Sequence, residues 1–495
     1  MRLAERIRRV LQLGGDGWAL EFEGTTFSWA QIEALADAIV GAVREAGARE
    51  HDVVGWVAEN LPGAIAGKAG LALHNHCCAL INPHLPAKIL AREIREQRFP
   101  VILGSDRFWS TEGLVEAARE AGSAALAVTL DSAGGTVRPV GGLDKVGPAP
   151  HREPMPGCVV ERLSSGTTGP PKRSPQSEEA ILKALEVGQR GGKGDELKIK
   201  SSPSIIFRPL AHAGSFSALL ALWSARPIAL QEKFSIEHTI IGAVGRHRPK
   251  VIQLVPAMIR MIWDADVPRE ALSSLIAVRS GTAPLDPELQ AAFEAKYGIP
   301  ILIDFGATEF GGVAAWTLPD HKVFAEAKRG SVGRAVPGAR LRTKDQESGE
   351  LITDGRMGIL EVDVDGKTDG WVATTDLAVL DADGFLYIRG RADDAIIRGG
   401  FKVLPDDVAR VLRQHPAVQD VIVVGIPHER LGQVPVAVIE TRLGAGQPDA
   451  AELQQLARDN LTPYQVPVSF KFTDKLPRTP SMKIIRAEVL EMAKA

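Results

Sequence analysis

The run from Leu163 to Lys172, LSSGTTGPPK, has the composition of a loop that binds phosphate. It combines consecutive hydroxyl side chains with two glycines and one lysine, so backbone N–H groups, hydroxyl groups and a cation can converge on one small volume. It is not a Walker A loop, because the order G-x-x-x-x-G-K-[ST] is absent and two prolines stand where that motif begins its helix. An ordinary Ser/Thr/Gly linker would explain the composition, but not the position of the lysine.

Further short runs with chemically active residues follow this loop along the chain. They read PLAHAG at 209–214, SGTAPL at 280–285, DFGATE at 304–309, TTD at 374–376, GRADD at 390–394 and PRTPSMK at 477–483. In this order they resemble the motifs of the adenylate-forming superfamily, which includes acyl-CoA synthetases, adenylation domains of peptide synthetases and firefly-type luciferases. TFSWAQIEALADAIV at 26–40 and INPHLPAKIL at 81–90 extend the resemblance to nearly the whole chain.

The resemblance implies an ATP-dependent acid:CoA ligase that works in two steps with ATP, Mg²⁺ and coenzyme A. A carboxylate first attacks the α-phosphate to give an acyl adenylate and pyrophosphate, and the CoA thiol then displaces AMP. The first step requires that the charges of ATP are neutralised and that the two reactants are aligned. Lysine, hydroxyl and carboxylate side chains are the residue types that this chemistry needs.

The resemblance also implies roles for individual residues. Cofactor-binding roles fall to Ser164, Ser165, Gly166, Thr167, Thr168, Gly169, Lys172, Gly281, Thr282, Ala283, Asp304, Phe305, Gly306, Asp376, Arg391, Gly399 and Gly400. Phe305 would stack on adenine, and Asp376 would accept hydrogen bonds from both ribose hydroxyls. Gly399 and Gly400 would line the tunnel through which the CoA thiol enters.

Catalytic roles fall to His212, Thr308, Glu309 and Lys483. Glu309 is the implied Mg²⁺ ligand, since a hard carboxylate oxygen suits that ion. Lys483 would bridge the substrate carboxylate and the α-phosphate in the first step. A small domain would then rotate about a hinge at Asp393 and bring a different face to the active site.

The implied acyl pocket is mostly apolar, and its glycines leave room for a ring or a chain. Its candidate residues are Phe207, His212, Val255, Met258, Gly306, Gly311 and Gly312. The run HAGSFSALLAL at 212–222 contains no acid that could pair with an ammonium group, which argues against an amino acid substrate. We therefore expect an aromatic or a medium- to long-chain carboxylic acid.

Arg173, Thr375 and Met482 replace glycines of the family pattern, and a side chain causes strain wherever the backbone needs a positive φ. The replaced glycines leave open a degenerate homologue that binds nucleotide without turnover. A second alternative is an enzyme that keeps the adenylation step and passes the acyl group to a carrier protein or another acceptor. His212 could also be an ordinary core histidine. The crowded run His74-Asn75-His76-Cys77-Cys78 suits no tetrahedral zinc site and is expected to be structural.

The motifs are spread over alternating helix and strand patterns, which predict an α/β protein. Helices are expected at Ala30–Glu45 and Ala87–Gln97, strands at Val53–Val57 and Pro100–Gly104, and a loop or linker at Glu153–Arg173. Short strands from about Gly333 to Ile388 predict a β-rich subdomain. We expect a large ATP- and acyl-binding domain of parallel-type sheets at 1–391 and a small mobile α+β domain at 392–495.

Composition narrows the possible partners. The 495 residues carry 58 Lys plus Arg and 61 Asp plus Glu, so the formal charge of −3 gives no basic field for nucleic acid. Gly63–Leu80 is interrupted by Lys68, His74 and His76, which argues against a membrane span. Three cysteines make neither a disulfide framework nor a C-x-x-C site, so we expect a cytoplasmic protein. Its expected partners are a carboxylic acid, ATP and CoA, and a homodimer is left open.

Overall fold

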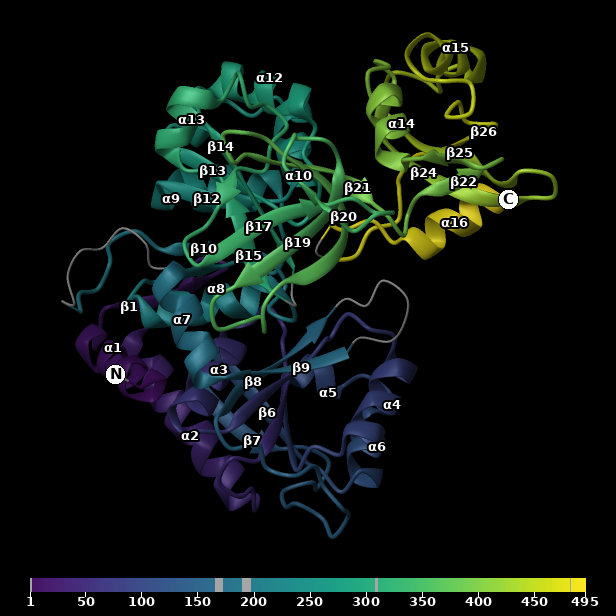
Figure 1. Ribbon diagram of the computed structural model, residues 1–495. Coiled ribbons are helices and arrows are strands. Elements are labelled where there is room, and N and C mark those ends of the chain that lie inside the picture. Colours follow the sequence, from purple (N-terminus) through teal and green to yellow (C-terminus); the bar gives the residue numbers. More distant parts are fainter. Residues whose placement is uncertain (1, 165–171, 189–196, 308–309, 481) are drawn as a thin grey trace. The chain divides into compact units, whose positions relative to one another are not determined.

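The computed structural model describes residues 2–164, 172–188, 197–307, 310–480 and 482–495. The chain forms two compact units (Figure 1). The first consists of Met1–Ile252 and Ala265–Leu275, and the second of Gln253–Asp264 and Ile276–Ala495. Both units combine helices with sheets, which confirms the predicted α/β class.

The first unit is built on a seven-stranded sheet with the order β7–β6–β5–β3–β4–β8–β9. Strands β6, β5, β3, β4 and β8 run parallel to one another. At the edges, β7 pairs antiparallel with β6, and β9 pairs antiparallel with β8. The strands are β3 (Val53–Val57), β4 (Cys77–Ile81), β5 (Val101–Gly104), β6 (Ala124–Asp131), β7 (Gly134–Pro139), β8 (Cys158–Ser164) and β9 (Lys172–Ser177).

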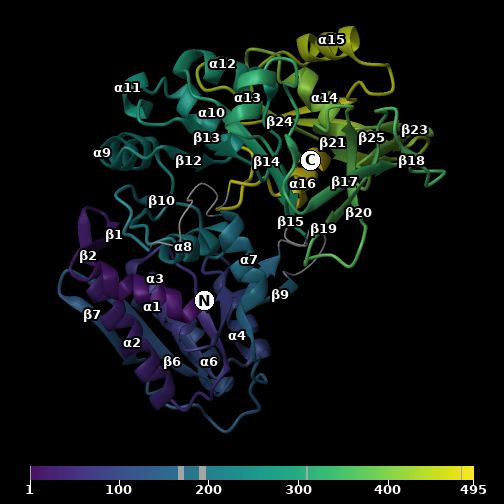
Figure 2. The ribbon, with the colours of Figure 1, turned by 60° about the vertical axis from the view of Figure 1, so that its left-hand side comes forward.

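Helices cover both faces of this sheet (Figure 2). They are α1 (Leu3–Gly14), α2 (Trp29–Glu45) and α3 (Pro62–Leu73) on one face, and α4 (Ala87–Gln97), α5 (Asp106–Trp109) and α6 (Leu114–Glu120) on the other. Successive strand side chains point to opposite faces, so Val54 and Trp56 join the core under α1 to α3, while Val53 and Val57 join the core under α4 to α6. A capping box between Ser28 and Gln31 begins α2.

A second sheet in the first unit has the order β10–β11–β1–β2. Its strands are β1 (Trp18–Phe22), β2 (Thr25–Ser28), β10 (Ser204–Ile206) and β11 (Ile228–Leu230). The remaining helices of this unit are α7 (Glu178–Gly188), α8 (Ala213–Trp223), the π-helix η1 (Ile236–Val244), α9 (Gly245–His247) and α11 (Arg269–Leu272). The sequence pattern did not predict the π-helix.

The second unit begins with a sheet of order β12–β13–β14–β15–β16 and continues with an antiparallel sheet of order β18–β17–β19–β20–β21. The strands are β12 (Val251–Leu254), β13 (Ala277–Ser280), β14 (Ile301–Ala307), β15 (Gly311–Ala315), β16 (Arg334–Ala335), β17 (Ala339–Lys344), β18 (Leu351–Ile352), β19 (Gly358–Val364), β20 (Val372–Leu380) and β21 (Leu386–Arg391). The helices of this segment are α10 (Pro256–Asp264), α12 (Pro287–Tyr297) and α13 (Leu318–Phe324). The strands from β16 to β21 confirm the predicted β-rich subdomain.

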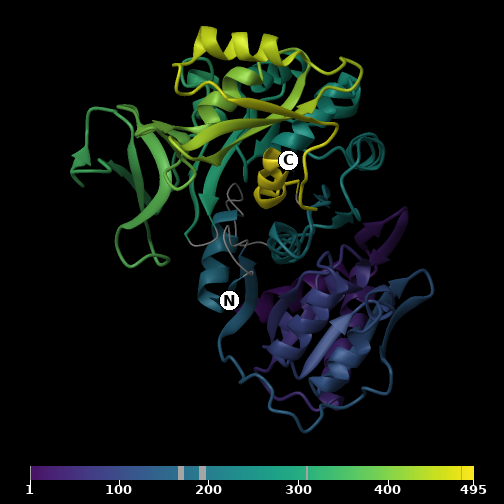
Figure 3. The same cartoon turned by 90° about the vertical axis from the view of Figure 1, so that its right-hand side faces the viewer.

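The C-terminal segment folds as an α+β layer around the sheet β23–β22–β25–β24, which β26 extends beside β25. Its elements are β22 (Ile396–Arg398), β23 (Phe401–Val403), α14 (Pro405–Leu412), β24 (Val418–His428), β25 (Gly432–Thr441), α15 (Ala450–Asn460), β26 (Ser469–Thr473) and α16 (Arg486–Lys494). Leu453 and Ala457 of α15, the yellow helix at the top of Figure 3, pack with Val421 and Ala437 of the sheet.

The prediction of a loop or linker at Glu153–Arg173 is wrong, and the domain boundary after residue 391 stays a prediction. The loop or linker expected at Glu153–Arg173 contains β8, and its last residues enter β9. The predicted boundary between residues 391 and 392 falls between β21 and β22, inside the second unit. Among the helices of the described ranges, none is both long and apolar enough to cross a membrane.

Candidate functional site

The two ends of the predicted phosphate loop are held together by a β-hairpin. β8 ends at Ser164, β9 begins at Lys172, and these two residues pair directly across the hairpin. A strand follows the loop where a Walker A motif would begin a helix, which agrees with the sequence argument. Five predicted residues lie outside the described ranges: Ser165, Gly166, Thr167, Thr168 and Gly169.

An ion-pair network lies on the β8–β9 hairpin. Arg173, the first residue after Lys172, donates to the carboxylate of Glu161 at 3.1 Å and also pairs with Glu93. Arg152 binds the same Glu161 through two hydrogen bonds of 2.7 and 2.8 Å. Both guanidinium groups lie over the Phe99 ring, at 5.2 and 5.5 Å from its centroid. Arg173 therefore has a structural function here that glycine could not perform.

Glu161 is the centre of this network, with only 3% of the residue exposed. Burial on its own would raise the pKa of this carboxyl group, but the hydrogen bonds and charges of Arg152 and Arg173 outweigh burial and hold the pKa below its ordinary value. Glu161 therefore stays charged and fixes the hairpin that carries the loop. Arg173 lies in strand backbone, so its replacement of a family glycine causes no φ strain.

The predicted acyl-pocket residues of the first unit lie around the start of α8. Phe207 is buried and meets Phe234 edge-on at 5.3 Å. His212 is half-buried and precedes the first residue of α8. A Cβ atom on Gly214 would lie 2.3 Å from the carbonyl oxygen of Arg208, so only glycine fits there.

Asn60 is a positioning residue that the sequence reasoning missed. Its amide group donates to the carbonyl oxygens of Arg208 and Gln231 at 3.2 and 3.0 Å, and its side-chain oxygen accepts from the Leu210 N–H group at 2.8 Å. Two of these bonds hold the segment that leads to His212, and the third joins Asn60 to the residue that follows β11. No pattern in the sequence marks Asn60, because its partners lie about 150 residues away.

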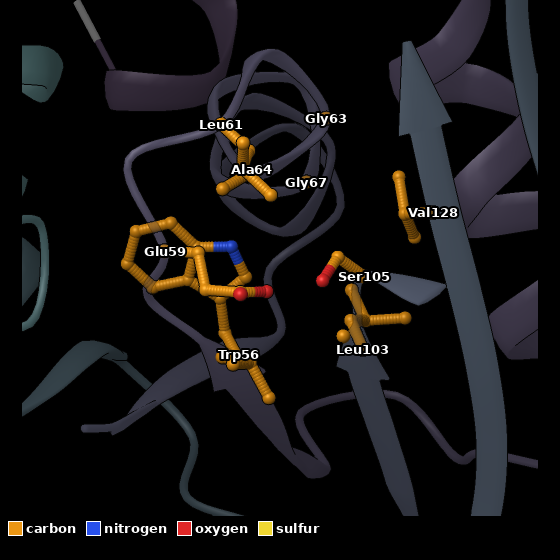
Figure 4. A pocket seen from close by; sticks show the side chains of 11 residues that line it. Trp56, Glu59, Leu61, Gly63, Ala64, Gly67, Leu103, Ser105 and Val128 are labelled. Carbon is orange, nitrogen blue, oxygen red and sulfur yellow. The ribbon is translucent and has the colours of Figure 1, made fainter. Parts of the chain in front are cut away.

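A small cavity of ≈ 20 Å³ opens beside α3, at the carboxyl ends of β3 and β5 (Figure 4). Its labelled lining residues are Trp56, Glu59, Leu61, Gly63, Ala64, Gly67, Leu103, Ser105 and Val128. Such a volume holds about one water molecule. None of the predicted acyl-pocket residues lines this cavity, so it is distinct from the predicted substrate site.

In the second unit, the segment 280–285, which the resemblance implies to contact adenine, lies against the middle of β14. A Cβ atom on Gly281 would lie 2.2 Å from the Oδ1 atom of Asp304, so glycine lets these two segments touch. Thr282 has a φ of +73° and is exposed, as is Ala283. Phe305 is half-buried beside the core of the β-rich subdomain. The predicted cofactor-binding residues of this region thus lie directly after β13 and on its neighbouring strand β14.

The pocket glycines of the second unit differ in what they do. Gly306 pairs with Gly312 across β14 and β15, and a Cβ atom on Gly306 would lie 2.2 Å from the carbonyl oxygen of Gly311. Gly306 is therefore needed for close strand pairing, whereas Gly312 faces open space. Val255 and Met258 are buried, at 7% and 3% exposure. Thr308 and Glu309, including the predicted Mg²⁺ ligand, lie outside the described residues.

The carboxylate predicted to bind ribose lies on the strand next to the segment that leads to the predicted hinge residue Asp393. Asp376 on β20 lies directly opposite Arg391 on β21. Burial raises the pKa of Asp376, although the charge of Arg391 acts in the opposite direction. Arg391 forms a two-bond ion pair with Asp393, at 2.9 and 2.7 Å. Thr375 lies in strand backbone, so the loss of a family glycine there causes no strain either.

Gly399 and Gly400 form the two-residue turn between β22 and β23, with φ values of +57° and +89°. Two positive φ values in a hairpin turn are typical of type I′, which favours glycine at both positions. The exposed turn thus has a sufficient structural reason for its glycines. The predicted role of this turn in CoA entry stays a prediction.

Lys483 is exposed on a tight turn near the end of the chain. The Thr479 N–H group donates to the Lys483 carbonyl at 2.7 Å, and the Lys483 N–H group donates to the Thr479 hydroxyl at 3.2 Å. Met482 has a φ of +64°, in the left-handed region that favours glycine. Of the three replaced glycines, Met482 is therefore the one whose backbone is strained.

Arg478 anchors this turn and was not singled out from the sequence. It binds Asp420 at 2.6 Å and Glu440 at 3.5 Å, and its side chain is 13% exposed. Glu440 also accepts a hydrogen bond from the Leu476 N–H group at 3.0 Å. The turn that presents Lys483 is thus tied to β24 and β25. Within the described ranges, no group of three or more His, Cys, Asp or Glu side chains could hold a metal ion.

The chain matches two family models, which together cover most of its length. The model of the AMP-binding enzyme family matches residues 7–370, and that of the AMP-binding enzyme C-terminal domain matches residues 407–483. The chain belongs to the AMP-binding enzyme family. The predicted domain boundary at residue 391 falls between the two matched segments of this AMP-binding enzyme. CoA ligases of this family use ATP, Mg²⁺ and CoA.

Individual relatives agree with the family assignment. The indoleacetate–CoA ligase of Aromatoleum aromaticum is 27% identical over 99% of this chain and 98% of its own length. The crystal structure of ATP-bound MatB from Rhodopseudomonas palustris has a TM-score of 0.81 and 22% identity, over 100% of this chain and 99% of its own. The amide bond synthetase McbA from Marinactinospora thermotolerans has a TM-score of 0.79 and 24% identity, over 98% and 99% of the two chains. The AMP-binding fold therefore extends over the whole chain.

Proposed function

We propose that this AMP-binding enzyme is an ATP-dependent acid:CoA ligase that acts on an aromatic or a medium- to long-chain carboxylic acid. The observation that carries the proposal is the anchored turn at Lys483. An exposed ammonium group on a turn held by Arg478, Asp420 and Glu440 is a preorganised cation for the charge that develops during adenylate formation. A protein that only binds nucleotide has no need of such a lysine.

Different segments of the chain would bind different parts of ATP. The loop after Ser164 and Lys172 would bind the β- and γ-phosphates through hydroxyls, backbone N–H groups and the lysine cation. Asp376 would accept hydrogen bonds from the ribose hydroxyls. Arg391, which lies opposite Asp376, would supply positive charge. The close contact of Gly281 with Asp304 would leave a flat edge for adenine beside Phe305.

Mg²⁺, held by Glu309, would neutralise phosphate charge. The protein residues then perform the first step by alignment: Lys483 pairs with both the carboxylate of the acid and an α-phosphate oxygen, so the attack on phosphorus is directed and pyrophosphate leaves. In the second step the segment 392–495 would rotate about Asp393, and Lys483 would leave the site. The thiol of CoA would enter past Gly399 and Gly400 and displace AMP from the acyl carbon.

Two observations support the class of acid. Three of the residues predicted for the pocket, Phe207, Val255 and Met258, are apolar and buried, and a Cβ atom on Gly312 would meet open space. One relative that matches over almost the whole chain is a ligase for indoleacetate, an aromatic acid. We also propose a cytoplasmic location, since all three cysteines are free thiols and suit a reducing compartment.

A panel of carboxylic acids tests this proposal. Pyrophosphate release would be measured for each acid with ATP and Mg²⁺, with and without CoA. We expect release with aromatic or aliphatic acids of sufficient size and faster turnover when CoA is present. Release that CoA does not accelerate, with no thioester formed, would favour transfer to a carrier protein or another acceptor. No release with any acid would favour a homologue that binds nucleotide without turnover.

A further inference from the structure

Two cysteines that are far apart in the sequence lie side by side in the first unit. Cys77 begins β4 and Cys158 begins β8, and their Sγ atoms are 3.0 Å apart. β4 and β8 are adjacent parallel strands with Cys78 paired to Val160. Both thiols face the core under α4 and α6, whereas Cys78 faces the opposite core.

The two cysteines stand on neighbouring paired strands, which suits a disulfide bond between them. Neighbouring strands lie about 4.8 Å apart. A disulfide bond requires Cα atoms about 4.4 to 6.8 Å apart and an S–S distance of about 2.05 Å. Starting from a separation of 3.0 Å, the two sulfur atoms need to approach by about 1 Å. Side-chain rotation supplies such a movement without a change in strand pairing.

The surroundings of the two thiols give them different reactivity. Cys77 is fully buried, whereas Cys158 is partly exposed. The Cys77 thiol donates its hydrogen bond to the Cys158 sulfur, which holds the pKa of Cys158 below its ordinary value and raises the pKa of Cys77. The thiolate is the reactive form of cysteine. Cys158 is therefore the residue that an oxidant meets first, and Cys77 is placed to react with the product.

We propose that Cys77 and Cys158 are a modification site that hydroperoxides convert to a reversible disulfide. The Cys158 thiolate attacks one peroxide oxygen, the O–O bond breaks, and the sulfur becomes a sulfenic acid while hydroxide leaves and takes up a proton as water. The Cys77 sulfur then attacks the Cys158 sulfur, the S–O bond breaks, and a second water is released. Two thiols are oxidised and one hydrogen peroxide is reduced to two waters.

A disulfide between residues 77 and 158 would close a long chain loop through α4, α5 and α6. Constraining such a loop in the unfolded chain stabilises the folded state. We therefore expect the oxidised protein to unfold at a higher temperature than the reduced protein. The disulfide would join the first residue of β8, Cys158, to β4, at the opposite end of β8 from Ser164.

The test uses the full-length protein, which is reduced, desalted and treated with hydrogen peroxide. Peptide mapping without reductant is expected to show one linked peptide pair containing Cys77 and Cys158, and titratable thiols should fall from three to one. Dithiothreitol should restore all three. Three thiols that persist after peroxide treatment, or a link that includes Cys78, would overturn the proposal. These readouts do not depend on ligase activity.

Matched variants separate the roles of the three cysteines. Cys78→Ala should form the same linked peptide, because Cys78 lies on the other face of β4. Cys77→Ser should leave a sulfenic acid on Cys158 that dimedone traps, and Cys158→Ser should react at least about tenfold more slowly with peroxide. Equal peroxide reactivity of wild type and Cys158→Ser would contradict the assigned order. The wild-type peptide map decides the pairing even where a variant fails to fold.

Discussion

Asp376 and Arg391 lie directly opposite each other on the antiparallel strands β20 and β21. Arg391 also forms two hydrogen bonds with Asp393, the predicted hinge residue. One guanidinium group therefore connects the predicted ribose-binding carboxylate with the point about which the C-terminal segment is expected to turn. Nucleotide binding and hinge position are expected to depend on the same local charges.

We predict that Asp376→Ala weakens ATP binding. The carboxylate would accept charge-assisted hydrogen bonds worth about 1.5 to 3 kcal/mol, equivalent to about a 10- to 150-fold rise in Kd. Isothermal titration calorimetry measures this change. Asp383→Asn is a matched control, since Asp383 is bound to Lys328 near the β20–β21 turn. An unchanged ATP affinity in Asp376→Ala would remove this residue from the ribose site.

The strained backbone at Met482 gives a second prediction. A side chain in the left-handed region costs about 1 to 3 kcal/mol, so Met482→Gly should relieve strain and speed up adenylation. Thioester formation from a presynthesised adenylate should change little, because Lys483 has left the site by then. Met482→Ala is the control: it keeps the strain and removes the side chain. If Met482→Gly slows adenylation as much as Met482→Ala does, the methionine contributes packing and the strain hypothesis is wrong.

Arg478 should act on adenylation through Lys483. Because Arg478 ties the turn to Asp420 and Glu440, Arg478→Ala should loosen the presentation of Lys483 and slow adenylate formation. ATP affinity should stay the same, and Arg478→Lys should restore part of the rate. Single-turnover measurement of adenylate separates these effects from binding. Equal losses in both half-reactions would indicate general unfolding of the C-terminal segment.

The network at Glu161 predicts a pH dependence of stability. Folding lowers the pKa of this carboxyl group from its ordinary value of 4.5. The stability that its charge contributes is therefore fully present above that pH and is lost as the pH falls through the lowered value. Urea unfolding should show Glu161→Gln to be less stable than wild type at pH 7, with a difference that shrinks in acid. The exposed Glu96→Gln should match wild type throughout, and a pH-independent difference for Glu161→Gln would refute the pKa argument.

Much of the fold could be predicted because local patterns agreed with tertiary packing. Ala87–Gln97 and Val53–Val57 have the predicted bounds, since helical and strand periodicity there match buried faces. β8 and β9 were missed because their sequences are rich in polar residues and include Pro175, which an edge strand tolerates. The error hid the pairing of β4 with β8, and with it the contact between Cys77 and Cys158.

The candidate site could be predicted only as far as short motifs extend. Lys483 stands in a recognisable run, but its anchor Arg478 depends on Asp420 and Glu440, which lie 58 and 38 residues earlier on β24 and β25. The same holds for Asn60, whose partners are distant in the sequence. Motifs indicate the groups that touch substrate, whereas the groups that position them depend on long-range packing.

We propose that this chain joins a carboxylic acid to CoA in a reaction that converts ATP to AMP and pyrophosphate. The most direct measurement follows acyl-CoA and AMP together by liquid chromatography and mass spectrometry, with ATP, Mg²⁺, CoA and the best acid of the panel. We expect equal amounts of thioester and AMP from the wild type, and loss of both in Lys483→Ala. The variant Lys475→Ala, at an exposed lysine, is the control and should be unaffected. AMP or acyl adenylate that forms while CoA is not consumed would contradict the claim.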